Sequence, residues 1–327
     1  MLFKIKYGIA SNNIDITRIV FEKCVYNNIL FIPRGDNIRD TLFTDPLPCT
    51  IKYIFIEQNG IVTEHNDSED IYIQMSYNVY DHNVDSIKSQ YYANDYTAII
   101  IEPREHRALY FVLNNFLENL PTNWSIIIFH GNQNVDYVNN IVDTKLSQYK
   151  YRIRLVNLKV DNLTGYEYSD ILKNKYIYDH IKTEYFIIFQ TDTLILKENK
   201  HLINDFLQYD YVGAPWKIDN CVGNGGLSFR RKSKMLEIIN QNSTQSTLEI
   251  HGNVFNISEI HEDIFFSYCK NVNVYKPDFE KAKQFAVETL FCDTSFGVHK
   301  PWQFLESNDW NFLKNKYQDI DILKDLQ

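Results

Sequence analysis

The chain has 327 residues, of which 44% are hydrophobic, 15% aromatic and 23% charged, and its formal net charge is −9. This composition excludes collagen-like, low-complexity and intrinsically disordered proteins. The negative charge argues against nucleic-acid binding, which depends on Lys and Arg at many phosphates. No apolar run approaches the roughly 18 to 20 residues that cross a bilayer, and the N-terminus lacks a signal-peptide pattern. We therefore expect a globular cytoplasmic protein with no membrane span and no nucleic-acid partner.

Residues 1–92 are composed of short β-type segments between turns. The segments are rich in Ile, Tyr, Phe and Val and read FKIKYG, NNILFIP, TIKYIFIEQNGIVTEHN and DIYIQMSY. Asn59-Gly60 is a strong signal for a two-residue hairpin turn. This part of the sequence predicts a small, β-rich accessory domain of the all-β class.

Residues 93–327 change to apolar runs that alternate with helical stretches. The runs are TAIII (97–101), WSIIIFHG (124–131), YRIRLVNL (151–158) and YFIIFQ (185–190). Continuous apolar strands joined by helical crossovers are typical of a parallel sheet buried on both faces. The pattern predicts an α/β domain with a Rossmann-like, mixed and mostly parallel sheet. The polar stretch 240–258 is predicted to be a loop.

Charged residues follow the first apolar run, at Glu102 and Arg104. In open α/β sheets, ligands bind at the carboxyl ends of the strands. The cluster is therefore either a site that recognises a nucleotide or the solvated, capped first turn of the next helix. The sequence leaves both interpretations open.

Asp192 lies three residues after the buried run YFIIF, behind Gln190 and Thr191, and His299 lies in a late loop bounded by Gly and Pro. Mg²⁺ and Mn²⁺ bind carboxylate oxygens, usually one or two from the protein together with substrate phosphates. An imidazole is a suitable second ligand. Asp192 and His299 are thus a candidate pair for a divalent cation, and the alternative for Asp192 is a capping role.

Two further segments carry chemistry. The loop Gly223 to Gly226 allows close approach of backbone to a ligand, but it matches neither a dinucleotide-binding nor a Walker motif. His261-Glu262-Asp263 opens a predicted helix. Its acids either favour the helix dipole or supply a general base.

Seven sequence blocks between residues 96 and 302 together resemble a domain-of-unknown-function family of A-type (GT-A) glycosyltransferases found in bacteria, fungi and giant DNA viruses. The blocks are IIIEPREH, NLPTNWSIIIFHG, FQTDTLIL, YDYVGAPW, VGNGGLSFRRKSKM, HEDIFFS and FGVHKPW. The preceding segment looks like a small β module that accompanies enzymes of giant viruses. The resemblance implies a transferase that takes a sugar from a nucleotide-sugar donor, with a UDP-sugar favoured.

In such enzymes a DxD motif holds a divalent cation that bridges the donor diphosphate. Here Gln190 stands where the first acid is expected, so Asp192 is the remaining acid and His299 matches the late histidine ligand. Lys300 is expected to help neutralise the diphosphate. Glu102, Arg104 and Lys173 are expected to frame the nucleotide, with Lys173 near the N-terminus of a helix that favours phosphate.

The resemblance makes Asp263 the base of an inverting transfer, with Glu262 as the second choice. It implies a glycan or glycoprotein acceptor, beside a group of residues that comprises Trp216, Asn224, Gly225 and Gly226. One alternative is a non-catalytic glycan-binding or structural protein derived from a transferase. Another is a metal-dependent hydrolase, although paired ligand motifs such as HExxH are missing. The oligomeric state, the donor sugar and the linkage stay open.

Overall fold

The computed structural model describes residues 3–26, 29–58, 60–74, 95–217 and 221–327. The chain divides into two compact units, Met1–Ala93 and Asn94–Gln327. The boundary expected between residues 92 and 93 lies outside the described residues. Within the described ranges, every helix is too short or too polar to cross a bilayer.

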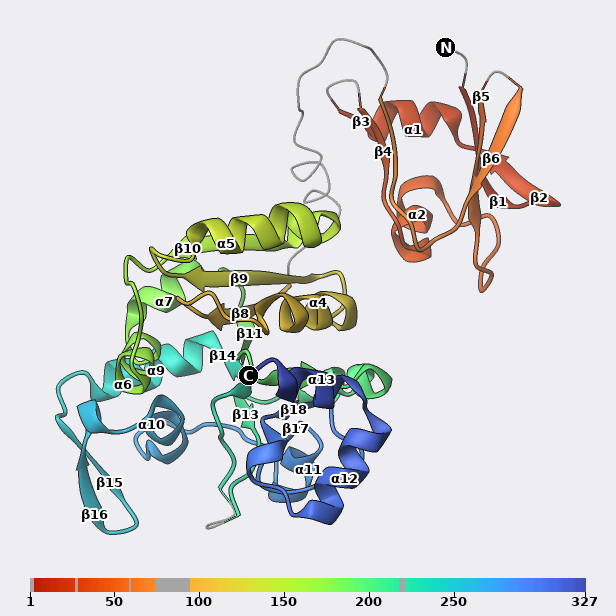
Figure 1. Ribbon diagram of the computed structural model, residues 1–327. Helices are drawn as coiled ribbons and strands as arrows, with labels where there is room; N and C mark the ends of the chain where they lie inside the picture. The colour runs from red at the N-terminus through yellow and green to blue at the C-terminus, as the bar shows by residue number, and fades with distance from the viewer. Residues whose placement is uncertain (1–2, 27–28, 59, 75–94, 218–220) are drawn as a thin grey trace. The chain divides into compact units, whose positions relative to one another are not determined.

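The first unit contains two antiparallel sheets, with strand orders β2-β1-β5-β6 and β3-β4-β7 (Figure 1). Its strands are β1 (Phe3–Ile9), β2 (Asn12–Asp15), β3 (Val25–Tyr26), β4 (Ile29–Ile32), β5 (Tyr53–Gln58), β6 (Ile61–His65) and β7 (Ile71–Gln74). Gln58 pairs with Ile61, so the predicted hairpin is confirmed. The all-β description is incomplete, because the unit also holds α1 (Thr17–Lys23) and α2 (Asp36–Phe43). Helices of two turns are too short to show a clear periodicity in sequence.

The second unit is built on a six-stranded sheet with strand order β10-β9-β8-β11-β14-β13. Its strands are β8 (Tyr96–Ile101), β9 (Trp124–His130), β10 (Ile153–Asn157), β11 (Tyr185–Phe189), β13 (Tyr211–Gly213) and β14 (Leu227–Arg231). The first four strands in this order are parallel to one another, whereas β14 is antiparallel to both β11 and β13. The predicted mixed, mostly parallel sheet is confirmed.

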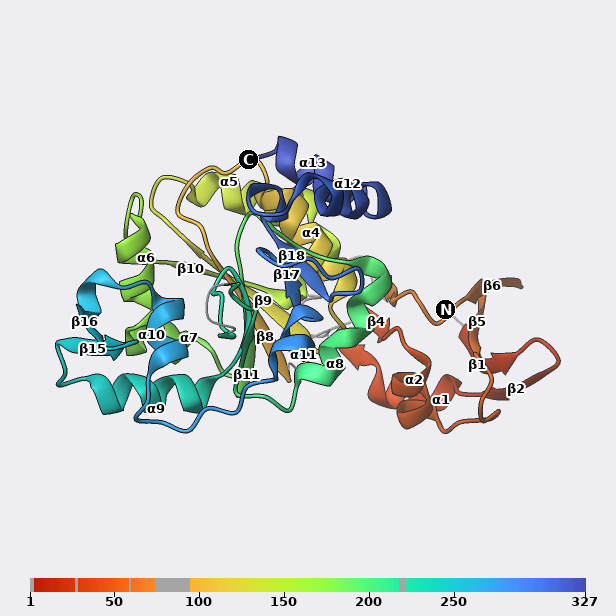
Figure 2. The same cartoon turned by 90° about the horizontal axis from the view of Figure 1, so that it is seen from below.

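Both faces of this sheet are buried, because alternate residues of β8 point into two different cores. Ala98 and Ile100 join the core on one face, and Ile99 and Ile101 join the core on the other. The first face is covered by α4 (Leu109–Asn119), α5 (Val135–Asn140), α12 (Ser307–Lys316) and α13 (Asp319–Asp325). The second is covered by α6 (Gly165–Leu172), α7 (Lys175–His180), α9 (Lys232–Asn242) and α10 (Glu262–Tyr268). Figure 2 shows the same two groups of helices from below. This double coverage explains why the strands read as continuous apolar runs.

Helix α4 ends where the sequence predicts, just before Pro121. The guanidinium of Arg152 donates hydrogen bonds to the carbonyl oxygens of Leu117 (2.9 Å) and Leu120 (3.2 Å) in the last turn. It therefore satisfies carbonyl groups that have no partner within the helix. This buried arginine serves the fold.

Smaller elements complete the second unit. They are β12 (Thr193–Ile195), β15 (Thr247–Ile250), β16 (Asn253–Asn256), β17 (Ala286–Val287), β18 (Gly297–His299), α8 (Ile203–Phe206) and α11 (Phe279–Lys283). Short 3₁₀ helices cover Ser147–Arg152, Lys197–Leu202, Ile257–Glu259 and Pro301–Gln303, and a π-helical segment covers Ile141–Lys145.

The prediction of a loop over residues 240–258 is wrong, because β15 and β16 form an antiparallel hairpin there. His251 and Gly252 make its turn, with φ values of 47° and 79°. Leu248 and Ile250 are buried on the inner face. Only these two positions carry the alternating apolar pattern, which the surrounding polar residues obscure in the sequence.

Candidate active site

The strand order of the large sheet reverses between β8 and β11, since β8, β9 and β10 extend to one side and β11 lies on the other. Such a reversal opens a crevice at the carboxyl ends of the two strands. A cavity of about 790 Å³ occupies this place. Its walls include residues 101–104, 162–165, 224–226 and 260–264, together with Gln190, His299 and Lys300.

Glu102 and Arg104 line the cavity as one unit. The Arg104 guanidinium binds both carboxylate oxygens of the buried Glu102, each at 2.8 Å. Asn134 donates to the backbone oxygens of Glu102 and Arg104, both at 2.9 Å, and so holds the loop. Because Glu102 is bound to Arg104, it positions the guanidinium, whose side chain is 57% exposed. Arg104 is the group available to a ligand, and its nucleotide-binding role stays a prediction.

The structure places Lys173 away from the cavity lining, at the C-terminal cap of α6. Its ammonium donates to the carbonyl oxygens of Ile257 (2.7 Å) and Ile260 (3.0 Å). The helix begins at Gly165, earlier than the sequence suggests, so Lys173 does not lie near its N-terminus. Lys173 therefore ties the segment before α10 to α6.

The N-terminus of α6 lies at the cavity and is already capped. Thr164 and Glu167 form a capping box, in which the Thr164 hydroxyl accepts from the Glu167 N–H and the Glu167 carboxylate accepts from the Thr164 N–H. These contacts place an acid where the sequence analysis expects phosphate, which weakens that expectation. Tyr168 and Ser169, on the same helix, do line the cavity.

Asp192 and His299 meet because β12 pairs with β18, with Thr193 opposite His299. Asp192 Oδ1 lies 3.3 Å from His299 Nε2. Although burial opposes both shifts, this contact lowers the pKa of Asp192, and contacts with Asp192 and Glu288 raise the pKa of His299 to about 9. Apart from each other, these two atoms have no hydrogen-bond partner among the described residues. Buried polar atoms without a hydrogen-bond partner need an explanation, and a bound water or ion is one of them.

The opposite edge of the His299 ring is fully bonded. Nδ1 lies 2.9 Å from Glu288 Oε1 and 3.0 Å from Asn224 Oδ1. A Cβ atom on Gly226 would overlap the ring, so glycine is required there for packing. Sequence reasoning missed Glu288, because the surrounding AVETL carries no motif. Asn224, Gly225 and Gly226, expected beside the acceptor, do line the cavity and also support His299 and α10.

The described residues contain no cluster of three or more His, Cys, Asp or Glu side chains arranged to hold a metal ion. Two facing ligand atoms 3.3 Å apart nevertheless suit adjacent positions on Mg²⁺ or Mn²⁺, whose ligands lie about 2.1 Å away for Mg²⁺. Gln190, in place of a first acid, lines the cavity nearby. Asp192 and His299 thus fit a divalent cation that takes its other ligands from substrate phosphate and water.

Lys300 follows His299 and lines the cavity in a left-handed conformation, with φ of 35°. Its backbone N–H donates to the Asp192 carbonyl oxygen at 2.9 Å. Left-handed backbone is uncommon for a residue with a side chain and is concentrated at functional sites. The conformation keeps Lys300 next to Asp192 and His299.

Glu262 is bound to a buried arginine. Arg230 donates to Glu262 Oε1 at 2.8 Å, and its guanidinium lies 5.0 Å and 5.2 Å from the ring centres of Tyr211 and Phe266. Burial raises the pKa of Glu262 to about 7, although Arg230 opposes the shift. Glu262 lines the cavity, but its carboxylate is bound to Arg230. Glu262 is therefore a weaker candidate for the base than Asp263.

Asp263, the next residue, also lines the cavity. Its Oδ1 accepts from the Ile264 N–H at 2.8 Å, and its Oδ2 accepts from the Gly225 N–H at 3.3 Å. Burial raises the pKa of this carboxyl group. A carboxylate that is held by backbone groups, with no side-chain cation bound to it in the described contacts, has the properties of a general base.

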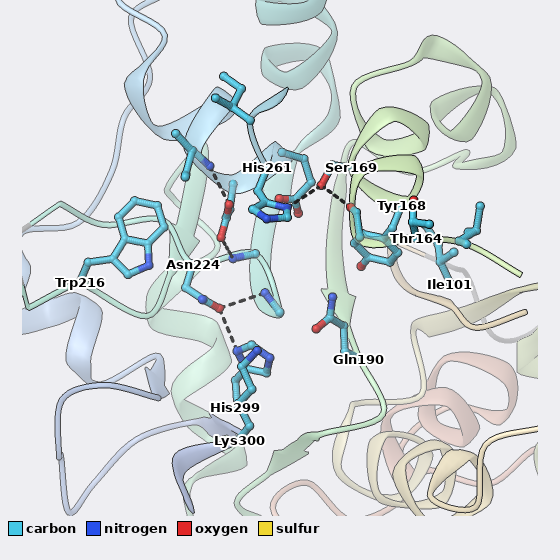
Figure 3. Close-up of a pocket in the computed structure, with 18 of the residues that line it drawn as sticks. Ile101, Thr164, Tyr168, Ser169, Gln190, Trp216, Asn224, His261, His299 and Lys300 are labelled. Carbon is cyan, nitrogen blue, oxygen red and sulfur yellow. Dashed lines mark hydrogen bonds between the residues drawn. The ribbon is translucent and has the colours of Figure 1, made fainter. Parts of the chain in front are cut away.

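Aromatic side chains form the wall that carries Trp216. The Trp216 ring is parallel to Tyr268 at 6.1 Å, and His251 meets Tyr268 edge-on at 5.2 Å. Phe255, on β16, lines the cavity while 43% exposed. Figure 3 shows Trp216 and Asn224 across the cavity from Thr164 and Tyr168, with Gln190 and His299 between them. The hairpin residues were missed because a loop was predicted there.

The family profile described as "Protein of unknown function (DUF5672)" matches residues 152–299, a span shorter than half of the chain. This span includes Asp192, Asp263 and His299. No curated protein matches the chain.

Solved structures similar to the chain include three glycosyltransferases. The mannosyltransferase PcManGT from Pyrobaculum calidifontis, in complex with GDP-Man and Mn²⁺, has 13% identity and a TM-score of 0.33 over 45% of this chain and 47% of that chain. Apo GlyE from Streptococcus pneumoniae TIGR4 has 10% identity and a TM-score of 0.42 over 71% and 62%. S. aureus TarS 1-349, in complex with UDP-GlcNAc, has 11% identity and a TM-score of 0.35 over 56% and 58%. The match covers less than two thirds of each of these chains. Because the identities and TM-scores are low, we infer no residue roles and no substrates from them.

Proposed function

We propose that this protein is a glycosyltransferase that moves a sugar from a nucleoside-diphosphate sugar, with a UDP-sugar favoured, to a hydroxyl group of a glycan or glycoprotein acceptor. The observation that carries the proposal is that His299 and Asp263 both line the strand-end cavity and that His299 Nε2 faces Asp192 Oδ1. The facing, otherwise unbonded atoms of Asp192 and His299 suit a cation, and Asp263 supplies a carboxylate held by backbone N–H groups. Every residue with a proposed role lies beyond residue 95, so we regard residues 1–92 as an accessory domain.

The donor diphosphate is proposed to lie between Asp192, His299 and Lys300. Asp192 and His299 would hold a divalent cation, which neutralises charge on the leaving diphosphate when bound. Lys300 lines the same part of the cavity and adds a positive charge for that leaving group. Arg104, held by Glu102, is available to the nucleotide at the wall formed after β8.

The acceptor hydroxyl is proposed to lie on the Trp216 side of the cavity, within reach of Asp263. As its oxygen bonds to the anomeric carbon, its proton passes to the Asp263 carboxylate. The bond from that carbon to the diphosphate oxygen breaks, and the nucleoside diphosphate leaves with the electron pair. Attack opposite the leaving group inverts the anomeric configuration.

A non-catalytic glycan-binding protein is the competing function. The observation that favours it is Gln190, which stands where an acid is expected. Asp192 is therefore the one carboxylate at the proposed cation position among the described residues. Such a protein would bind sugars at the aromatic wall without breaking the donor bond. Turnover therefore separates the two functions.

The test is a screen of nucleotide sugars for hydrolysis and transfer, with Mn²⁺ and with a chelator. We expect turnover of at least one donor, loss of turnover in the chelator and in Asp192→Asn, and an inverted product. Asp170→Asn, an exposed acid on α6, is the control and should keep wild-type activity. Nucleotide or glycan binding without turnover of any donor would contradict the transferase, and a product that retains the donor configuration would remove the base role of Asp263.

A further inference from the structure

Glu288 holds the edge of His299 that faces away from Asp192. It follows β17, is 3% exposed, and places Oε1 at 2.9 Å from His299 Nδ1. The same oxygen accepts a hydrogen bond from Asn224 Nδ2 at 2.9 Å. A buried carboxylate is costly unless it is hydrogen-bonded, so these contacts account for its burial here.

The contacts of Asn224 fix the orientation of its amide. Its Oδ1 accepts from the Gly226 N–H at 3.0 Å, and its Nδ2 donates to the Glu288 carboxylate. A backbone N–H only donates and an ionised carboxylate only accepts, so exchanging the amide oxygen and nitrogen would break both bonds. The atom that faces His299 Nδ1 at 3.0 Å is therefore an acceptor.

His299 Nδ1 is thus surrounded by two acceptor oxygens, one from Glu288 and one from Asn224. An acceptor pair at this distance requires a hydrogen on Nδ1. A cation at Nε2 needs the lone pair of that atom, so it would displace any hydrogen there and leave the hydrogen on Nδ1 in place. Nε2 faces Asp192 Oδ1 at 3.3 Å and has no hydrogen-bond partner among the described residues.

We propose that Glu288, together with Asn224, is a positioning residue that keeps the proton of His299 on Nδ1 and presents Nε2, beside Asp192, to a divalent cation. The inference rests on the proposed function, because it concerns the same cation. Carboxylates that accept the second N–H of a ligating histidine orient the ring and strengthen the ligand, and their loss typically costs about 10- to 100-fold in metal affinity. The purely structural alternative is an imidazolium held between two carboxylates, with no cation.

The test uses the full-length protein with UDP and Mn²⁺ as probes. Mn²⁺ affinity is measured by electron paramagnetic resonance for wild type, Glu288→Gln, His299→Gln and the surface control Glu280→Gln. We expect about 10- to 100-fold weaker binding in Glu288→Gln, a larger loss in His299→Gln, and no change in Glu280→Gln, whose side chain is 75% exposed. Glu288→Asp keeps a carboxylate and should recover part of the affinity.

Two outcomes separate the inference from the proposed function. Absence of Mn²⁺ binding by wild type with UDP would overturn the cation in the proposed function. Binding by wild type that is lost in His299→Gln but unchanged in Glu288→Gln would overturn the role of Glu288 alone.

If Glu288→Gln does not fold, nitrogen-15 NMR of wild type with Mg²⁺ and UDP decides the tautomer, with the His299 signals assigned by their absence in His299→Gln. A proton on Nδ1 with none on Nε2 supports the proposal. A proton on Nε2 contradicts it.

Discussion

Each unit of the molecule contains a cluster of charged groups around a buried side chain, and the two clusters differ in whether the polar atoms of that side chain all have partners. In the first unit, the ammonium of Lys52 is 1% exposed and lies 2.9, 3.2 and 3.0 Å from carboxylate oxygens of Asp36, Asp40 and Asp45. The Tyr7 hydroxyl lies 2.8 Å from carboxylate oxygens of Asp36 and Asp40. The Lys52 ammonium and the Tyr7 hydroxyl therefore both have partners within this cluster, in which three carboxylates face one ammonium.

In the second unit, only one of the two ring nitrogens of His299 has hydrogen-bond partners among the described residues. Glu288 and Asn224 occupy Nδ1, whereas Nε2 and Asp192 Oδ1 face each other without further hydrogen bonds among the described residues. Since buried polar atoms are normally bonded, we interpret the first cluster as one that stabilises the fold and propose that the second binds a ligand. The same distinction predicts which substitutions change folding and which change activity.

The largest effect is expected at the ligand-side cavity, in Asp263→Asn. Loss of the general base should lower the rate of transfer by about 10² to 10⁴. The melting temperature and nucleotide affinity should stay close to wild type, because the Asn oxygen can still accept from the Ile264 N–H and only the long 3.3 Å bond from the Gly225 N–H is lost. Steady-state kinetics with thermal melting measure both quantities. The control is Glu259→Gln, an exposed acid in the preceding segment, and equal rates in all three proteins would remove Asp263 from the mechanism.

Lys52→Met tests the role of the charged cluster in the first unit. Removing the buried cation leaves three neighbouring carboxylates without their partner, which should lower the free energy of unfolding of the first unit by about 3 to 5 kcal/mol. Nucleotide affinity should not change, because the residues with proposed roles belong to the second unit. Denaturant unfolding and calorimetric titration provide the comparison. A stable variant with weakened nucleotide binding would reverse the roles given to the two clusters.

The stability of the second unit should depend on pH through Glu262. The charged or titratable groups that interact with it are Arg230, Asp263, Tyr168, Tyr178 and Tyr211. Burial raises its pKa from 4.5 to about 7, so between these values the folded state holds a proton that the unfolded state has released. Its contribution to stability therefore falls as pH rises from about 4.5 to about 7 and is constant above that range.

Glu262→Gln should remove this pH dependence. The difference in unfolding free energy between wild type and variant, measured at several pH values, isolates the Glu262 contribution from other titrating groups. A difference that is independent of pH over this window would show that Glu262 has an ordinary pKa.

The smallest effect concerns the aromatic wall. Phe255 and Val254 are neighbours on β16 that point to opposite faces and are 43% and 69% exposed. Phe255→Ala should raise the KM for the acceptor about 3- to 10-fold, from roughly 1 kcal/mol of ring contact. The donor KM should be unchanged, and the matched control Val254→Ala should leave both constants as they are. Equal KM values in the two variants would exclude the hairpin from acceptor binding.

Much of the second unit's fold is predictable from local sequence. The runs TAIII, WSIIIFHG and YFIIFQ become β8, β9 and β11, because strands buried on both faces need apolar side chains at nearly every position. Helix α10 begins at Glu262 as the HED segment predicts. The β15–β16 hairpin was not predicted, because two apolar positions in a polar stretch are too few to define a period.

The site residues divide in the same way. Asp192 and Asp263 are recognisable in the sequence because the first lies in the short segment after an apolar strand and the second lies in the first turn of a predicted helix. The prediction that Lys173 lies beside phosphate is wrong because it assumes that α6 begins several residues later than it does. Lys173 lies at the C-terminal end of α6, where its ammonium donates to a backbone carbonyl oxygen. Glu288 was missed, since its environment depends on contacts with residues distant in the chain.

By itself, the sequence determined where β8, β9 and β11 lie along the chain and which acids follow β8 and β11, because apolar runs and strand-end residues are properties of neighbouring positions. Only the tertiary structure decided which side chains meet. The pairing of β12 with β18 brings Asp192 to one edge of His299, and the loop before β14 brings Asn224 to the other edge, beside Glu288. Hydrogen bonds between distant segments leave no period in the sequence, so the bonded edge and the open edge of His299 are visible only in the folded chain.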